Sequence, residues 1–405
     1  MESSRYPSLS LLLFALFILF FQEFFGWRVS QAQQSHTASL QNPSLVFITI
    51  PPYGSTQDLI GRVKNANPDS FKVAVYIFIE GGGWWTKPAF AQPLTPIRSD
   101  STWTTDVTTG GNDIYATRIH AFLIPNGIAP PTSRGFACLP AFIDTISVAD
   151  GLVERNPRTV SFSGHEWWVK ASVVPVGPGP NYFSDSRDNV WVDEQDRLHL
   201  RSIERDGKWY CPELISKKPF GYGIYTFKFA STIGRINENA VLGLFTWDND
   251  ACDAFHREID IEFSRWGVAS DLNAQYVVQP WDRTGNRRRW MIPPSLEHST
   301  HRFEWRADSI SYSSFQGFNA SPPADSILQS WNYTGPNIPT PGNERPRINL
   351  WLFRGQPPKD SSEVEVIISS FEFKNYTTSV SEQNGAQAGS FYLHQNFPNP
   401  FNPNT

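Results

Sequence analysis

Residues 256–266, HREIDIEFSRW, decide the fold class and hold the most informative side chains of the chain. The acids Glu258, Asp260 and Glu262 alternate there with three apolar residues. Successive side chains of a β-strand point to opposite faces, so the pattern predicts a strand with three carboxylates on one face and an apolar face toward a core. Neighbouring acids repel one another, so stability alone does not explain them. A cation site or a catalytic cleft does.

The spacing of these acids suits glycoside hydrolysis, which needs one carboxylate as nucleophile and another as proton donor. On an extended strand the Cα atoms of Glu258 and Glu262 lie ~13–14 Å apart. Their carboxyl groups reach the ~5–5.5 Å of a retaining pair if each side chain leans about 4 Å toward Asp260. Asp260 can then hydrogen-bond the nucleophile and keep the pKa of the donor high.

Short apolar runs separated by turn residues continue on both sides of this stretch. Residues 71–79, FKVAVYIFI, are apolar on both faces, which is typical of a central sandwich strand. The 32 prolines and 27 glycines disfavour long helices. The sequence therefore predicts an all-β protein with a smaller β-sandwich-like module at residues 45–150 and a larger sandwich domain at 160–378.

The composition limits the kind of partner. The 405 residues carry 34 Lys and Arg against 39 Asp and Glu, and this net charge of −5 argues against nucleic acid. Fifteen tryptophans favour surfaces that stack against sugars. The cysteines Cys138, Cys211 and Cys252 have no metal-like spacing, and they predict neither a zinc site nor a disulfide framework.

The N-terminal module contains GGGWWTKP at residues 81–88. Trp84 and Trp85 form either a sugar platform on a loop or a turn whose indoles cover the edge of the sandwich, and both alternatives stay open. We expect residues 45–150 to be an accessory module. The larger domain should fold and act on soluble substrate without this module.

Residues 1–32 predict a secretory signal peptide. Arg5 precedes an apolar run at residues 11–21, and the small residues Ser30 and Ala32 mark a cleavage site. Eleven apolar residues fall short of the ~20 that span a bilayer, so we expect no stable membrane span; an uncleaved anchor is the alternative.

Residues 391–405, FYLHQNFPNPFNPNT, follow a linker at 379–390 and resemble the truncated start of a type IX secretion C-terminal sorting domain. The resemblance implies contact with secretion machinery and a secreted or cell-surface location. A Pro/Asn-rich tail is the alternative.

The EIDIE motif resembles the active-site signature of glycoside hydrolase family 16, and the likeness covers residues 161–376. Further similar segments are SKKPFGYGIYTFKF at 216–229, AVLGLFTWDND at 240–250, HRFEWRADSISYSSFQG at 301–317 and RINLW at 347–351. The resemblance implies a concanavalin A-like β-jelly-roll and a secreted retaining endo-β-glycosidase. It assigns Glu258 as nucleophile, Asp260 as assisting acid and Glu262 as general acid/base. Ser313, Ser314 and Gln316 depart from the family's usual residues.

The spacing E-x-D-x-E has no inserted residue, whereas laminarinase- and agarase-like members accommodate one in a β-bulge. The unbulged form resembles lichenases and xyloglucan-active members, so the implied substrate is a β-glucan of lichenan or xyloglucan type.

Substrate-binding candidates follow from the same resemblance, and a packed core position is the alternative for each. They are Trp351, Gln275, Trp247, Glu213 and Trp266.

No cofactor or catalytic metal is expected. The resemblance allows a structural calcium ion, which the sequence does not place. A lectin-like binder and a transglycosylase are the alternative functions on this fold, and we expect a monomer.

Overall fold

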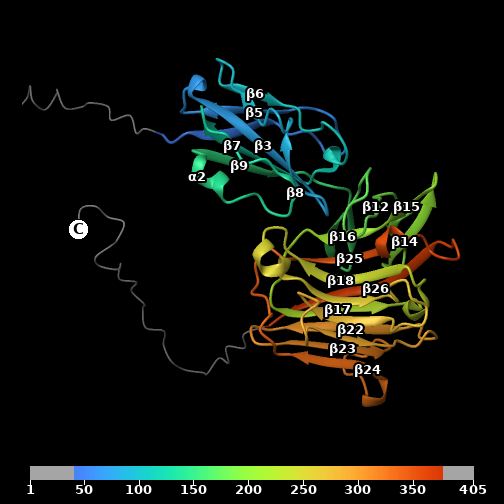
Figure 1. The fold of residues 1–405 in the computed structure, drawn as a ribbon. Coiled ribbons are helices and arrows are strands. Elements are labelled where there is room, and N and C mark those ends of the chain that lie inside the picture. Colours follow the sequence, from blue (N-terminus) through green and yellow to red (C-terminus); the bar gives the residue numbers. More distant parts are fainter. Residues whose placement is uncertain (1–40, 377–405) are drawn as a thin grey trace, which may run out of the picture.

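The computed structural model describes residues 41–376, which form two β units joined in sequence (Figure 1). The predicted signal peptide, the linker at 379–390 and the sorting segment at 391–405 lie outside the described residues. Among the residues described, no helix is long and apolar enough to cross a membrane.

The first unit, called here the N-terminal unit, spans residues 44–154. Its strands are β1 Ser44–Thr49, β2 Leu59–Lys64, β3 Phe71–Ile79, β4 Gly83–Lys87, β5 Leu94–Pro96, β6 Thr102–Thr105, β7 Arg118–Pro125, β8 Arg134–Phe136 and β9 Ala149–Glu154. A three-stranded sheet has the order β1-β2-β6, and a six-stranded sheet has the order β8-β4-β3-β7-β9 with β5 paired to β3. A short helix, α2 Phe142–Ile146, precedes β9.

The second unit, called the large sandwich, spans residues 159–375. Its strands are β10 Thr159–Phe162, β11 His165–Val169, β12 Tyr182–Phe183, β13 Val190–Val192, β14 Leu198–Arg205, β15 Lys208–Cys211, β16 Glu213–Ser216, β17 Gly223–Phe229, β18 Ala240–Trp247, β19 Ile259–Phe263, β20 Ala274–Val278, β21 Arg287–Trp290, β22 Ser299–Trp305, β23 Ile310–Gln316, β24 Ile327–Tyr333, β25 Arg345–Leu352 and β26 Val364–Asn375. Short 3-10 segments lie at η1 Pro68–Ser70, η2 Asp113–Tyr115, η3 Ile233–Arg235, η4 Cys252–Arg257, η5 Ala324–Ser326 and η6 Phe353–Gly355.

The large sandwich has two sheets. One has eight strands in the order β10-β11-β16-β25-β18-β19-β20-β21. The other has nine, in the order β12-β15-β14-β26-β17-β22-β23-β24 with β13 paired to β14. A core of buried aromatic and aliphatic side chains drawn from strands of both sheets joins them. The all-β jelly-roll sandwich predicted from the sequence is confirmed.

The alternation predicted for the acidic strand is also confirmed. Ile259, Ile261 and Phe263 are fully buried in the core between the sheets. The acids on the same strand therefore face away from that core, because the side chains of a strand alternate between its two faces.

The two units share an apolar core. Buried residues of β2, β3 and β7 form one cluster with Val176, Phe183 and Leu352 of the large sandwich. A disulfide between Cys138 and Cys252, 114 residues apart in sequence, also links the units. The number and spacing of the cysteines predict no disulfide, and the structure corrects this, because the fold brings segments distant in sequence together and places these two Cα atoms 6.2 Å apart.

Trp84 and Trp85 lie in β4 and cover the sheet. Trp84 is buried and packs against Phe78, with ring centroids 5.2 Å apart. The indole Nε1 of Trp85 donates to the carbonyl of Gly82 at 2.9 Å. These contacts favour the covering alternative over the sugar platform.

Candidate active site

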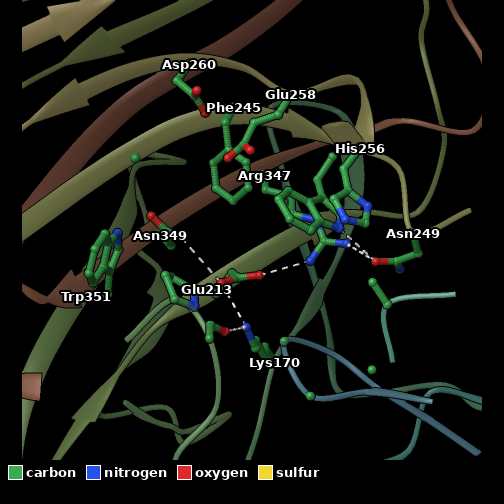
Figure 2. Close-up of a pocket in the computed structure, with 18 of the residues that line it drawn as sticks. Lys170, Glu213, Phe245, Asn249, His256, Glu258, Asp260, Arg347, Asn349 and Trp351 are labelled. Carbon is green, nitrogen blue, oxygen red and sulfur yellow. Dashed lines mark hydrogen bonds and ion pairs between the residues drawn. The ribbon is translucent and has the colours of Figure 1, made fainter. Parts of the chain in front are cut away.

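Strand β19 brings the three acids to one cavity of about 430 Å³. Glu258 directly precedes β19, while Asp260 and Glu262 lie within it. The pairing of β19 with β18 and with β20 continues without a register shift, so the strand carries no bulge. Figure 2 shows Glu258 and Asp260 on the same side of the cavity.

Burial dominates the electrostatics of the acids. Asp260 is only 3% exposed, and Glu258 and Glu262 are half-buried. Burial, followed by the charges of Glu258 and Glu262, raises the pKa of Asp260 well above its usual range. Burial and then the charge of Glu262 raise the pKa of Glu258. The raised pKa expected for Glu262 is confirmed, with burial as its main cause.

Two amide side chains hold the acids in place. Nε2 of Gln275 donates to Oε2 of Glu262 at 2.7 Å, and Nε2 of Gln279 donates to Oδ2 of Asp260 at 3.1 Å. Asp260 and Glu258 hydrogen-bond to each other. The pKa of Glu258 is raised too, and the two carboxyl groups interact closely, so a proton bound at the pair lies between them and either oxygen can donate it. Glu262 lies further along the strand and contacts Gln275 instead.

Strands β18 and β25 supply the aromatic part of the cavity. Trp247 and Trp351 line it, and both are half-buried. The ring of Trp247 stacks on His256 with centroids 4.1 Å apart and an angle of 10° between planes. The exposed parts of these rings offer the apolar faces against which sugar rings stack.

Beside the acids lies a fully buried network of charges (Figure 2). Nζ of Lys170 donates to Glu213 at 3.1 Å. Nη1 of Arg347 donates to Glu213 at 3.1 Å and to Glu80 of the N-terminal unit at 2.9 Å. Two cations and two anions balance within the network, which is how buried charges are tolerated.

Two polar atoms at the cavity have no hydrogen-bond partner within the described residues. They are Oδ1 of Asn349 and Nε of Arg347, and both residues line the cavity. Buried polar atoms are nearly always hydrogen-bonded in native proteins. These two atoms are themselves covered, so they mark unsatisfied polar groups beside the cavity and not contacts that a ligand can reach directly.

Of the five predicted binding residues, three line the cavity and two do not. Trp351, Trp247 and Glu213 line the cavity, although Glu213 is only 1% exposed and already ion-paired. Gln275 lies behind Glu262 and does not line the cavity. Trp266 does not line it either and packs edge-on against Trp351, with centroids 6.2 Å apart. Trp266 is half-buried, so it does not occupy a packed core position.

Sequence reasoning missed several residues that line the cavity. From the large sandwich they are Lys170, Gly177, Pro178, Gly243, Phe245, Asn249, His256, Arg347 and Asn349. The period of two along RINLW could have indicated Arg347 and Asn349, because they share a face with Trp351. For Lys170 no local pattern exists, since it reaches the cavity only through the packing of β11 against β16.

The segment before Glu258 has an unusual backbone. Phe255, His256 and Arg257 all have left-handed φ angles of 49°, 56° and 52°. Non-glycine residues adopt this region at a cost in energy, and such residues cluster at functional sites. Arg257 is held by Asp248, whose carboxylate accepts from Nη1 at 2.7 Å. The segment fixes the direction from which Glu258 enters the cavity.

Within residues 41–376, no group of three His, Cys, Asp or Glu side chains is arranged to hold a metal ion. We therefore assign no site among these residues to the structural calcium ion that the sequence resemblance allows.

The sequence matches no protein-family model and no curated protein. Several solved structures are similar to the larger part of the chain. A β-glucanase of Bacillus licheniformis is 16% identical, with 54% of this chain and 96% of that chain covered and a TM-score of 0.40. A β-1,3-1,4-glucanase (lichenase) from a mouse hindgut metagenome is 15% identical, covering 51% and 92%, with a TM-score of 0.38. A laminarinase from Flavobacterium sp. UMI-01 is 12% identical, covering 52% and 93%, with a TM-score of 0.39. At these scores the likeness extends to neither mechanism nor substrate.

Proposed function

We propose that the protein is a retaining β-glycosidase that cleaves a polysaccharide by double displacement. The observation that carries the proposal is the set of three acids at alternate positions that line one cavity, Glu258 directly before β19 and Asp260 and Glu262 within it. In this mechanism Glu258 attacks the anomeric carbon, while Glu262 protonates the departing oxygen. Water activated by Glu262 then releases the sugar from Glu258.

In this mechanism Asp260 donates a hydrogen bond to the nucleophile while it holds the proton of the pair. Its donation stabilises the negative charge on Glu258 and orients that carboxylate. The raised pKa of Glu262 keeps a proton available near neutral pH for the leaving group. Trp247 and Trp351 supply stacking surfaces for sugar rings.

The substrate we propose is a β-glucan of mixed-linkage or xyloglucan type. The support is the unbulged spacing of β19, which the regular pairing with β18 and β20 preserves. We also propose that the protein acts outside the cytoplasm. The Cys138–Cys252 disulfide supports this location, because disulfides persist in oxidising compartments.

The test is the stereochemistry of the fresh products. The enzyme is supplied with lichenan, xyloglucan, laminarin, agarose and carrageenan, and proton NMR follows the first anomer released. A retaining pair on one strand leaves no room for the water that an inverting mechanism places opposite the acid, so we expect the β-anomer first. An initial α-anomer would overturn the mechanism. Binding without any sugar release would instead favour the lectin-like alternative. Activity confined to laminarin or agarose would overturn the substrate and leave the mechanism intact.

A further inference from the structure

One end of the cavity is built by the N-terminal unit. Six lining residues come from that unit and lie around the β3–β4 turn and β8: Phe78, Gly81, Gly82, Gly83, Gly135 and Ala137. They face the same cavity as the three acids of β19, although more than 100 residues of sequence separate them.

The β3–β4 turn sits directly on the large sandwich. The backbone N–H of Gly177 donates to the carbonyl of Gly81 at 2.9 Å, and Nζ of Lys170 donates to the carbonyl of Gly177 at 2.6 Å. Gly81 has a φ of +71°, and a Cβ there would lie 2.1 Å from the Gly177 oxygen. Only glycine permits so close an approach. The turn is therefore fixed in place at the edge of the cavity.

The cross-strand neighbours of Glu262 show on which side of the acids this turn blocks a glycan that lies across the strands. From Glu262 the row passes through Gly243 of β18 and Asn349 of β25 to Glu213 of β16. At its end Glu213 and the adjacent Lys170 are only 1% and 3% exposed. A sugar ring cannot lie over side chains that are already covered, so a glycan crossing the strands in this direction ends at the turn.

The opposite direction is free of the N-terminal unit. Beyond β19 the side chains of Arg287 and Trp281 are exposed, and the guanidinium of Arg287 lies 5.2 Å from the Trp281 ring centroid. The lining of the cavity ends at Glu262 of β19 on that side, and no residue of the N-terminal unit lies among Gln275, Trp281 and Arg287 beyond it. The β16 side is covered, and the side beyond β19 carries exposed side chains.

We infer that the N-terminal unit acts as a wall that limits how many sugar units bind on the β16 side, so that the enzyme acts on the end of a glycan chain. This inference rests on the proposed glycosidase function. It departs from the internal cutting that the family resemblance implies.

The first experiment follows products from a soluble glucan that the full-length enzyme cleaves. Mass spectrometry in the first minutes should show one short product length, with solution viscosity falling slowly relative to the appearance of reducing ends. A ladder of product lengths with an early loss of viscosity would overturn the inference, while the β-anomer test of the proposed function would be unaffected.

The second experiment makes the cavity smaller by a substitution in the N-terminal unit. Ala137 is exposed and lines the cavity, so Ala137→Trp adds bulk to the part of the cavity that the N-terminal unit contributes without disturbing a core. We expect kcat/KM to fall about tenfold and the main product to shorten. The matched control is Ala141→Trp, an exposed alanine of the same unit that does not line the cavity. Unchanged products from Ala137→Trp would overturn the inference.

Oligosaccharide binding to Glu258→Ala provides a readout that does not need turnover. Adding Ala137→Trp to this variant should weaken binding about tenfold in calorimetry, and adding Ala141→Trp should not. If the wild-type protein releases no sugar from any glucan, the proposed function is contradicted, while this difference in binding would still support the wall. Equal affinities for both double variants would contradict the wall.

Discussion

At the scale of single residues, Glu258 is the side chain with the most specific predicted role. Glu258→Ala should lower kcat by roughly 10³-fold or more, because the covalent step loses its nucleophile. The fold should remain intact, since the side chain faces a cavity and not the core. Azide should restore turnover by occupying the vacated space, with inverted product. The control is Glu166→Ala on β11, an exposed acid that does not line the cavity and should retain activity. Full activity in Glu258→Ala would remove the residue from the mechanism.

The same residue should make stability depend on pH. Burial raises the pKa of Glu258 in the folded state, so the folded protein binds its proton more tightly than the unfolded chain does. The free energy of unfolding therefore falls as pH rises above the ordinary carboxyl value of ~4.3, and stays lower once the folded-state pKa is passed. Glu258→Gln removes this dependence, and it should be more stable than the wild type at pH 8 and equal to it at pH 4.

The gain at pH 8 should be on the order of 1 kcal/mol, because the half-buried carboxyl is partly screened by water. Urea denaturation of both proteins at the two pH values measures it. Glu166→Gln is the matched substitution at an exposed site and should show the same difference from wild type at both pH values. A gain at pH 4 as large as at pH 8 would contradict the assignment of the raised pKa.

At the scale of elements, β25 joins the two units through two arginines in different environments. Arg347 pairs with the buried Glu80, whereas Arg345 pairs with Glu154, whose side chain is 47% exposed. Burial alone would raise the pKa of Glu80, but the charges of Arg347, Arg118 and Lys170 lower it, so Glu80 is ionised. Loss of the buried Arg347–Glu80 pair should therefore lower the free energy of unfolding more than loss of the exposed Arg345–Glu154 pair.

Glu80→Gln should reduce the free energy of unfolding by about 3–5 kcal/mol, because it leaves excess positive charge buried around Arg347. The matched control Glu154→Gln breaks the exposed pair and should cost no more than ~1 kcal/mol. Urea denaturation at pH 7 compares the two. Equal losses would show that the buried network does not hold the units together.

At the scale of the whole molecule, the shared core changes what we expect of a fragment. The sequence predicts that the larger domain folds and acts alone. In the structure, removal of the N-terminal unit would expose Val176, Phe183 and Leu352, and would leave Arg347 without Glu80. We therefore expect a fragment of residues 157–376 to be much less stable than the full chain, and to aggregate on gel filtration. A monomeric fragment with the stability and activity of the full chain would show that the two units are independent.

The sequence by itself determined the sandwich class and the acidic strand. Both depend on local alternation, which is visible along residues 258–263 because a strand's period of two assigns each side chain to a face. Tertiary structure alone decided which tryptophans reach the cavity, since Trp351 lines it while Trp266 packs behind it. It also decided the Cys138–Cys252 pairing and the place of Gly81 at the cavity edge. The disulfide alone joins residues 114 positions apart, and no local pattern encodes which distant segments will meet.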